Sequence, residues 1–216
     1  MLPCGNRKVY IVTYVTIDMT KSERKILENV KLSNVDIAHT RILQLFFSTP
    51  DLEMSLNELS GKLKISKTTA KKVILELEKL GFIIKKTYGK TWSIRCNKQH
   101  SYNSTRKISS NLEVIFENYP NWRQQIIDIA GNPKAVILFG SYRKGDDTED
   151  SDIDIAVEVS DNKNIRIVPF AIIHKFGYRK DVLVNLHIFS RNKIDINLFS
   201  NIANGIVLEG FLEVRP

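Results

Sequence analysis

The chain has 216 residues, a length that suits one large domain or two small ones. Apolar residues make up 43% of it, which is enough for a packed core and excludes a wholly disordered protein. No apolar run reaches the roughly 18 residues that a membrane span needs, and no signal peptide is evident. Cys4 and Cys96 are too few for a disulfide framework or a zinc site, so we expect a cytoplasmic protein without a membrane segment.

Positive charge is concentrated in the first half of the chain. Residues 1–110 carry 20 Lys and Arg against 9 Asp and Glu, whereas residues 111–216 carry 12 against 15. This asymmetry suggests two domains with different partners. A basic half fits nucleic acid, although a solvated lysine-rich surface would give the same balance.

A strand-like pattern opens the chain. Residues 9–17 are β-branched and aromatic. Residues 1–18 are either an authentic strand or the result of a start codon placed too far upstream, and the sequence leaves both readings open. Over residues 36–48 the apolar residues recur near helical spacing, and Pro50 ends this predicted helix.

Two more helices and a hairpin are predicted next. Ser55 opens a short helix, and Ser66 suits the N-cap of a helix over residues 67–80. Gly81 suits the position just beyond that helix, where a left-handed conformation ends it. Two strand-like runs then meet around residues 88–90, which predicts a β-hairpin.

The order of elements over residues 36–95 resembles the winged helix-turn-helix family. This resemblance implies that the third helix enters the major groove of double-stranded DNA, with lysines on phosphates and threonines at base edges. Lys85 and Lys86 on the wing would contact the flanking backbone. The alternative is a domain that mediates dimerisation or binds a protein and has merely solvated lysines. Winged-helix regulators often form homodimers, but the sequence does not show whether this chain does. The predicted DNA-contacting residues are Lys67, Thr68, Thr69, Lys71, Lys72 and Lys90.

A polar segment separates the two halves. Residues 97–110 are short of apolar residues, and we interpret them as a linker. A helix is predicted over residues 111–118, and Pro120 stops it. A second helix is predicted from Asn121 through Ala130.

A buried strand, a Gly-Ser pair and an Asp-x-Asp pair follow in succession. Residues 134–139 form an apolar run, Gly140 and Ser141 come next, and a second strand begins at Asp152 and Asp154. Side chains two apart on a strand point to the same face, so the two carboxylates lie together. That is unfavourable unless a cation lies between them, and oxygen ligands suit Mg²⁺ or Mn²⁺. Gly140 lets the backbone approach a phosphate, and Ser141 offers a hydroxyl and an N–H.

This stretch, LFGSYRKGDDTEDSDIDIAV, resembles the signature of the nucleotidyltransferase superfamily, and Gly145 and Ser151 fit its minimal branch. The resemblance implies that Asp152 and Asp154 hold one or two Mg²⁺ ions. An acceptor hydroxyl would attack the α-phosphorus of a nucleoside triphosphate, and pyrophosphate would leave. The nucleotide-binding residues implied are Gly140, Ser141, Arg143 and Lys144, of which the last two could equally belong to a solvated loop.

The loop acids are expected to be solvated rather than to bind metal. They are Asp146, Asp147, Glu149 and Asp150.

The predicted strand over residues 182–189 departs from the family pattern. Its alternation places Asn185 and His187 on the same face. Members of the superfamily usually have a third acidic residue at about the position of Asn185, which activates the acceptor hydroxyl. Asn185 can still offer a carbonyl oxygen to a metal, but with less charge. His187 is either structural or a substitute base, and Asp181 is another candidate substitute.

These features predict an α+β protein in three parts. Residues 1–96 form the winged helix-turn-helix domain, residues 97–110 the linker, and residues 111–216 a nucleotidyltransferase-type α/β domain with a mixed sheet. The chain is expected to end in a helix and a short edge strand.

The predicted function is metal-dependent transfer of a nucleoside monophosphate to an acceptor hydroxyl, with Asp152, Asp154 and Asn185 as the catalytic residues. The acceptor stays open: a protein hydroxyl, as in the relatives that pair with a toxin, a small molecule, or a nucleic-acid end. The alternative is a winged-helix transcription regulator whose transferase domain has lost turnover. In that reading the domain senses a nucleotide or supports dimerisation.

Overall fold

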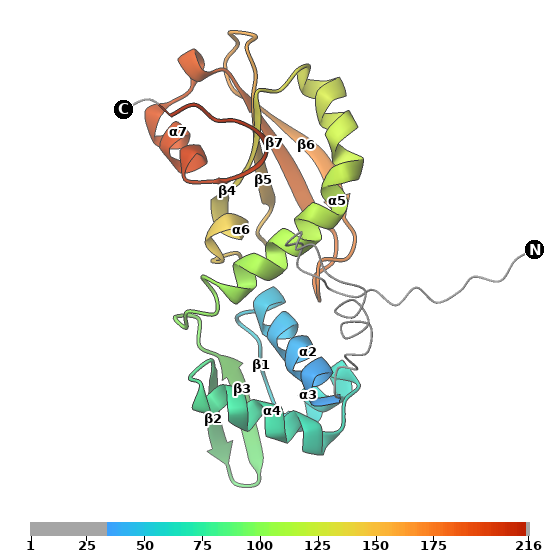
Figure 1. The fold of residues 1–216 in the computed structure, drawn as a ribbon. Coiled ribbons are helices and arrows are strands. Elements are labelled where there is room, and N and C mark those ends of the chain that lie inside the picture. Colours follow the sequence, from blue (N-terminus) through green and yellow to red (C-terminus); the bar gives the residue numbers. More distant parts are fainter. Residues whose placement is uncertain (1–33, 215–216) are drawn as a thin grey trace, which may run out of the picture. The chain divides into compact units, whose positions relative to one another are not determined.

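The computed structural model describes residues 34–214, so the strand predicted at residues 9–17 lies outside the described residues (Figure 1). The described part confirms the α+β class, with a largely helical first half and a mixed sheet in the second. Within it, no helix is long and apolar enough to cross a membrane. In chain order the elements are α2 (Asn34–Ser48), β1 (Glu53–Met54), α3 (Leu56–Leu63), α4 (Lys67–Lys79), β2 (Ile83–Tyr88), β3 (Thr91–Cys96), α5 (Arg106–Ala130), β4 (Ala135–Phe139), α6 (Gly140–Lys144), β5 (Ile153–Glu158), β6 (Arg166–Ile173), β7 (Val182–Phe189), the 3₁₀ turn η1 (Arg191–Lys193), α7 (Ile196–Ala203) and β8 (Ile206–Gly210).

The helix starts in the first half follow the predicted caps. The Ser55 hydroxyl accepts the Glu58 N–H at 3.2 Å, and the Glu58 carboxylate accepts the Ser55 N–H at 2.7 Å, which completes a capping box at α3. Ser66 caps α4 by accepting the Thr69 N–H at 3.0 Å. Gly81 follows α4 with a φ of 83°, a conformation that favours glycine, and so confirms the predicted helix end.

The hairpin of β2 and β3 is also confirmed, but it belongs to a three-stranded sheet of order β1-β3-β2. Strand β1 has only two residues, too few to leave a period in the sequence, so it was not predicted. The three helices and this sheet enclose one core, in which Phe46, Ile74 and Phe82 are fully buried.

The second half is built on a five-stranded sheet of order β6-β7-β5-β4-β8. Strands β5 and β7 are parallel and the other pairs are antiparallel, which confirms the predicted mixed sheet and the edge position of the last strand. One face packs against α5, through residues such as Ile115 and Ile126. The opposite face packs against α7, chiefly through Ile202. The site described below lies on the α7 face, because Ala156, two residues after Asp154, belongs to that core.

The prediction of two helices separated at Pro120 is wrong. Helix α5 runs without a break from Arg106 to Ala130, with Pro120 inside it, and begins within the segment interpreted as a linker. A proline removes the hydrogen bond to the carbonyl four residues earlier, here that of Phe116. Phe116 is 48% exposed, so water can reach that part of the helix. The buried side chains of Tyr119 and Trp122 then hold the helix to the sheet on either side of the proline.

Strand β6 was not predicted. Its sequence, RIVPFAII, contains Pro169, which normally argues against a strand. The proline is tolerated because β6 is an edge strand and the pairing with β7 shifts between Pro169 and Ala171.

Asp161, just after β5, should make the fold sensitive to acid. It accepts hydrogen bonds from the Ser190 hydroxyl at 2.7 Å, from Arg166 at 2.7 Å and from the Lys163 N–H at 3.1 Å. These bonds lower the pKa of Asp161 from its ordinary value of 3.8. A lowered carboxyl pKa stabilises the fold above the ordinary value, and this stability is lost as the pH falls toward the folded pKa.

We therefore expect the Asp161→Asn variant to lose less free energy of unfolding than the wild type as the pH falls from about 5 to about 3. Urea unfolding midpoints across that range would measure it. Glu149→Gln, a change at an exposed acid, is the control. Parallel pH curves for the wild type and Asp161→Asn would contradict the prediction.

Candidate active site

Asp152, Asp154 and Asn185 come together at the start of β5. Asp152 immediately precedes the strand, and Asp154 pairs in register with Asn185 on β7 and with Phe139 on β4. The Asn185 amide also donates to Asp152 Oδ2 at 3.2 Å. The structure thus brings together, from segments 33 residues apart, the three residues predicted to be catalytic.

Gly140 lies directly against this group. It begins α6 at the end of β4 with a φ of 75°, in the left-handed region. A Cβ atom at this position would be only 2.7 Å from Asp154 Oδ2. A side chain here would therefore displace the carboxylate, and glycine allows the carboxylate to lie against the backbone.

Ser141 is the next residue and is half-buried. Its hydroxyl makes no hydrogen bond to any residue within 34–214. Arg143 and Lys144 occupy the last turn of the short helix α6, the first half-buried and the second exposed. The Gly-Ser pair is therefore adjacent to the carboxylates, as its predicted phosphate-binding role requires, and that role stays a prediction.

His187 forms a hydrogen bond with the Asp154 carboxylate. Its Nε2 lies 2.9 Å from Asp154 Oδ1, and its ring packs edge-on against Phe139 at 4.9 Å between centroids. Because an ionised carboxylate only accepts hydrogen bonds, Nε2 carries the proton. The other nitrogen, Nδ1, is buried and has no hydrogen-bond partner among the described residues. Neither nitrogen is open to an acceptor hydroxyl in this arrangement, so His187 holds the carboxylate in place.

Asp181, the other candidate substitute for the missing acid, is directed elsewhere. It is exposed, has a φ of 53°, and pairs with His174 Nδ1 at 2.7 Å. The described residues contain no group of three or more His, Cys, Asp or Glu side chains placed to hold a metal. The oxygen ligands available at the site are thus two carboxylates and the Asn185 amide, whose carbonyl would face Asp152 after a half-turn of its terminal torsion.

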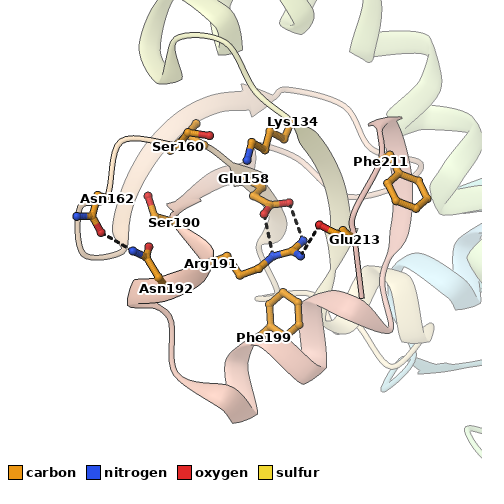
Figure 2. Close-up of a pocket in the computed structure, with 11 residues that line it drawn as sticks. Lys134, Glu158, Ser160, Asn162, Ser190, Arg191, Asn192, Phe199, Phe211 and Glu213 are labelled. Carbon is orange, nitrogen blue, oxygen red and sulfur yellow. Dashed lines mark hydrogen bonds and ion pairs between the residues drawn. The ribbon is translucent and has the colours of Figure 1, made fainter. Parts of the chain in front are cut away.

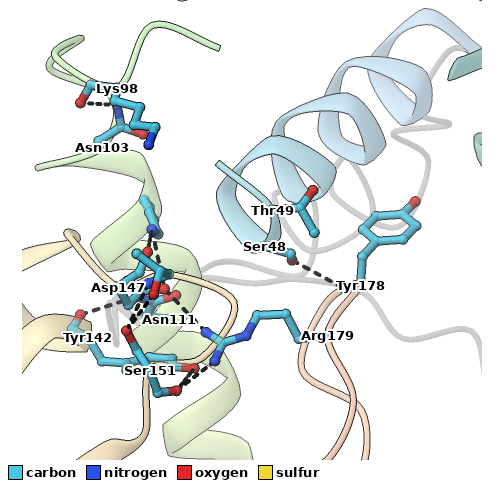
Figure 3. A network of polar contacts seen from close by, with 12 residues as sticks. Ser48, Thr49, Lys98, Asn103, Asn111, Tyr142, Asp147, Ser151, Tyr178 and Arg179 are labelled. Atoms are coloured by element: carbon cyan, nitrogen blue, oxygen red, sulfur yellow. Dashed lines mark hydrogen bonds and ion pairs between the residues drawn. The ribbon is translucent and has the colours of Figure 1, made fainter. Parts of the chain in front are cut away.

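The expectation that Asp147 is solvated is wrong (Figure 3). Asp147 is only 2% exposed, and Lys107 Nζ lies 3.3 Å from its Oδ2. Asn111 donates to Oδ1 at 2.9 Å and also to the Tyr142 carbonyl at 3.1 Å. Lys107 and Asn111 are on the first turns of α5, so this buried network holds α5 against the loop between α6 and β5. A run of acids in a loop predicts solvation, and nothing local in the sequence distinguishes Asp147 from its neighbours.

The predicted DNA-contacting residues gather on α4 and on the wing. Lys67, Thr68, Lys71 and Lys72 are exposed on α4, and Lys90 is exposed at the tip of the hairpin. Thr69 is half-buried, and its hydroxyl lies 2.8 Å from that of the cap residue Ser66. Thr69 is therefore engaged in capping the start of α4.

Lys85, which was expected to contact the DNA backbone, has partners within the domain. It pairs with Glu78 at 2.8 Å and lies over the Trp92 ring at 4.5 Å. The adjacent wing residue Lys86 is exposed.

A pocket of about 920 Å³ lies at the far end of β5, around Glu158 (Figure 2). Its central cation, Arg191, is held by the Glu158 carboxylate at 3.1 and 3.3 Å and by Glu213 at 3.4 Å, and lies over the Phe199 ring. Because two carboxylates compensate its charge, Arg191 is not available to bind an anion in this pocket. Glu158 is four residues beyond Asp154, so the pocket is roughly 13 Å along the strand from the carboxylates.

Comparison with protein families finds two matches. The family described as a nucleotidyltransferase domain matches residues 123–202, a range that contains Gly140, Ser141, Asp152, Asp154 and Asn185. The family described as an HTH domain matches residues 39–92, which include α4 and the hairpin. The search of curated proteins found no match to the chain. The two matches together show a nucleotidyltransferase-type domain in the second half of the chain joined to a helix-turn-helix domain in the first, the architecture that the sequence predicted.

Proposed function

We propose that this protein is a divalent-metal-dependent nucleotidyltransferase that transfers a nucleoside monophosphate from a nucleoside triphosphate to an acceptor hydroxyl. One observation carries this proposal: Asp152 and Asp154 lie together beside Gly140, where a side chain would collide with the Asp154 carboxylate. Glycine at this position lets the Asp154 carboxylate lie against the backbone at the start of α6, which puts the proposed metal ligands beside the Gly-Ser backbone proposed to bind phosphate.

The residues fit a hard divalent cation such as Mg²⁺ or Mn²⁺. Asp152 and Asp154 supply negatively charged oxygen ligands, and Asn185 can add an uncharged one. When bound, such a metal would neutralise the triphosphate and lower the pKa of an acceptor hydroxyl. The donor set is smaller than the three carboxylates of the family pattern, and we therefore expect slow turnover.

The roles of the other residues follow from their positions. Ser141 would donate its N–H and hydroxyl to phosphate oxygens, since the hydroxyl has no partner among the described residues. Arg143 and Lys144 would add positive charge near the leaving pyrophosphate. His187 would keep Asp154 oriented by its hydrogen bond at 2.9 Å.

A second function is favoured by a specific observation. Asn185 stands where the family has an acid, and both nitrogens of the nearby His187 are enclosed or engaged. Among residues 34–214, no side chain at the site other than the two proposed metal-ligand carboxylates is then placed to accept the acceptor's proton. A domain of this kind could bind a nucleotide with its metal and not transfer it, so that the chain acts as a nucleotide-sensing DNA-binding regulator.

One experiment separates the two functions. The full chain would be incubated with each labelled nucleoside triphosphate and Mg²⁺, and both pyrophosphate release and nucleotide binding would be measured, with candidate protein, small-molecule and nucleic-acid acceptors added in turn. Transfer that requires Mg²⁺ supports the enzyme. Mg²⁺-dependent binding without transfer to any of these acceptors supports the regulator, and the absence of both overturns the proposed nucleotide site.

We also propose that the first half binds double-stranded DNA through α4 and the wing. Exposed lysines on one helix and at the hairpin tip are suited to contact the phosphates that flank a major groove. The net charge of residues 1–110, with 20 Lys and Arg against 9 Asp and Glu, supports the same partner.

Reversing two of these charges should weaken DNA binding strongly. We expect Lys71→Glu/Lys72→Glu to lower affinity by at least tenfold, because each lost phosphate contact also removes a released counterion. A gel shift at two salt concentrations measures both the affinity and its salt slope. Lys163→Glu/Lys193→Glu, the same charge change at exposed lysines of the other domain, is the matched control. An unchanged affinity for the α4 variant would place the interface elsewhere.

A further inference from the structure

Arg179 is a buried cation whose guanidinium reaches the segment just before β5, the strand that carries Asp154. It follows β6 and precedes β7, and only 6% of it is exposed. Its backbone is held by reciprocal hydrogen bonds with Phe176 at 3.1 and 2.9 Å, which close a tight turn. Its guanidinium lies over the Tyr142 ring at 5.3 Å. The side chain is therefore fixed from both ends.

The guanidinium makes one short hydrogen bond, and it goes to the residue before Asp152. Arg179 Nη2 donates to the Ser151 carbonyl at 2.6 Å, as Figure 3 shows. The same guanidinium approaches Asp147 Oδ2 at 3.6 Å, which compensates part of its charge. Its Nε and Nη1 atoms are buried and have no hydrogen-bond partner among the described residues. Burying an arginine with two unmade bonds is unfavourable, so stability alone does not account for it.

The carbonyl that accepts this hydrogen bond belongs to the peptide bond that joins Ser151 to Asp152. Asp152 lies just outside β5, whose register with β7 begins at Ile153 and Val184. Asp154, by contrast, is inside the sheet and is paired on both sides. The Asp152 backbone therefore lacks the pairing that holds Asp154. The Ser151 carbonyl accepts the short bond from Arg179 and a longer one, of 3.4 Å, from the Tyr142 hydroxyl, and the short bond is the stronger restraint on the peptide plane from which Asp152 projects.

We propose that Arg179 is a positioning residue for Asp152: through the Ser151 carbonyl it sets the direction of this carboxylate toward the divalent cation. The proposal rests on the proposed function of Asp152 and Asp154 as metal ligands. Residues that orient a ligand typically change metal affinity by about 10- to 100-fold when they are replaced.

The test measures metal binding in the full chain without nucleotide, with Mn²⁺ as the probe and free Mn²⁺ followed by electron paramagnetic resonance. Arg179→Met removes the donor and keeps the length of the side chain, and it should raise the Mn²⁺ dissociation constant by about 10- to 100-fold. Arg179→Lys keeps the charge and can donate to either the Ser151 carbonyl or Asp147, so a smaller rise is expected. Arg123→Met is the matched control, because Arg123 is an exposed arginine of the same domain that pairs with Glu209 at 2.8 Å.

The outcomes separate this proposal from the proposed metal site on which it rests. Measurements are made at a temperature where circular dichroism shows each variant to be folded; if Arg179→Met does not fold, Arg179→Lys decides. A folded Arg179 variant with wild-type Mn²⁺ affinity, alongside an Asp152→Asn variant that has lost it, overturns the positioning role alone. If the wild-type protein binds no Mn²⁺, the metal site fails and this inference fails with it.

Discussion

Asp154→Asn is expected to lower Mg²⁺-dependent nucleotide binding and any nucleotidyl transfer by about 10²- to 10³-fold. The change keeps the size of the side chain and removes its charge. A metal ion contributes several kcal/mol through charge stabilisation at such a site, and each 1.4 kcal/mol corresponds to about a tenfold change. Asp152→Asn should have a similar effect. Titration of a fluorescent nucleoside triphosphate analogue with and without Mg²⁺ would measure it.

The loop before the strand offers a matched control. Asp150→Asn makes the same substitution at an exposed carboxylate two residues before Asp152. We expect it to leave Mg²⁺-dependent binding unchanged within about twofold, because solvated charges outside a metal site contribute little. Equal losses in Asp150→Asn and Asp154→Asn would show a general electrostatic effect and would count against direct metal ligation.

Asp147→Asn is expected to reduce the free energy of unfolding by about 3–5 kcal/mol, the usual result of removing one partner from a buried ion pair. The substitution would leave Lys107 buried without its carboxylate at 3.3 Å, and Arg179 without the one at 3.6 Å. Urea unfolding followed by circular dichroism would measure the change. Asp146→Asn, at the exposed residue beside it, should change stability by less than about 0.5 kcal/mol.

A double variant tests whether the loss comes from uncompensated charge. Burial lowers the pKa of Lys107 from its ordinary 10.5 and raises the pKa of Asp147 from its ordinary 3.8. The stability tied to the Lys107 shift is present above the ordinary value and is lost as pH falls, and the stability tied to Asp147 is lost as pH rises. Near neutral pH the ionised pair therefore opposes folding. We expect Lys107→Met/Asp147→Leu to recover part of the loss, and a double variant less stable than Asp147→Asn would refute this explanation.

Much of the local structure was predictable because its causes are local. Ser55 and Ser66 cap helices through bonds to residues three positions away, and those bonds need only the right side chain at the right offset. The predicted helix break at Pro120 was wrong because the contacts that keep the helix intact are not local. A proline lowers helix stability locally, but contacts of Tyr119 and Trp122 with a distant sheet outweigh that effect.

The sequence by itself determined which residues form the core of the candidate site, because alternation along one strand places Asp152 and Asp154 on one face and Gly140-Ser141 follows directly on an apolar strand. Only the tertiary structure decided what surrounds them. The parallel pairing of β5 with β7 brings Asn185 to Asp152 and His187 to Asp154 across 33 residues. The packing of α5 buries Asp147, and the turn before β7 directs Arg179 to the Ser151 carbonyl. Such contacts depend on register and burial, which arise when distant strands and helices pack and which no local pattern records.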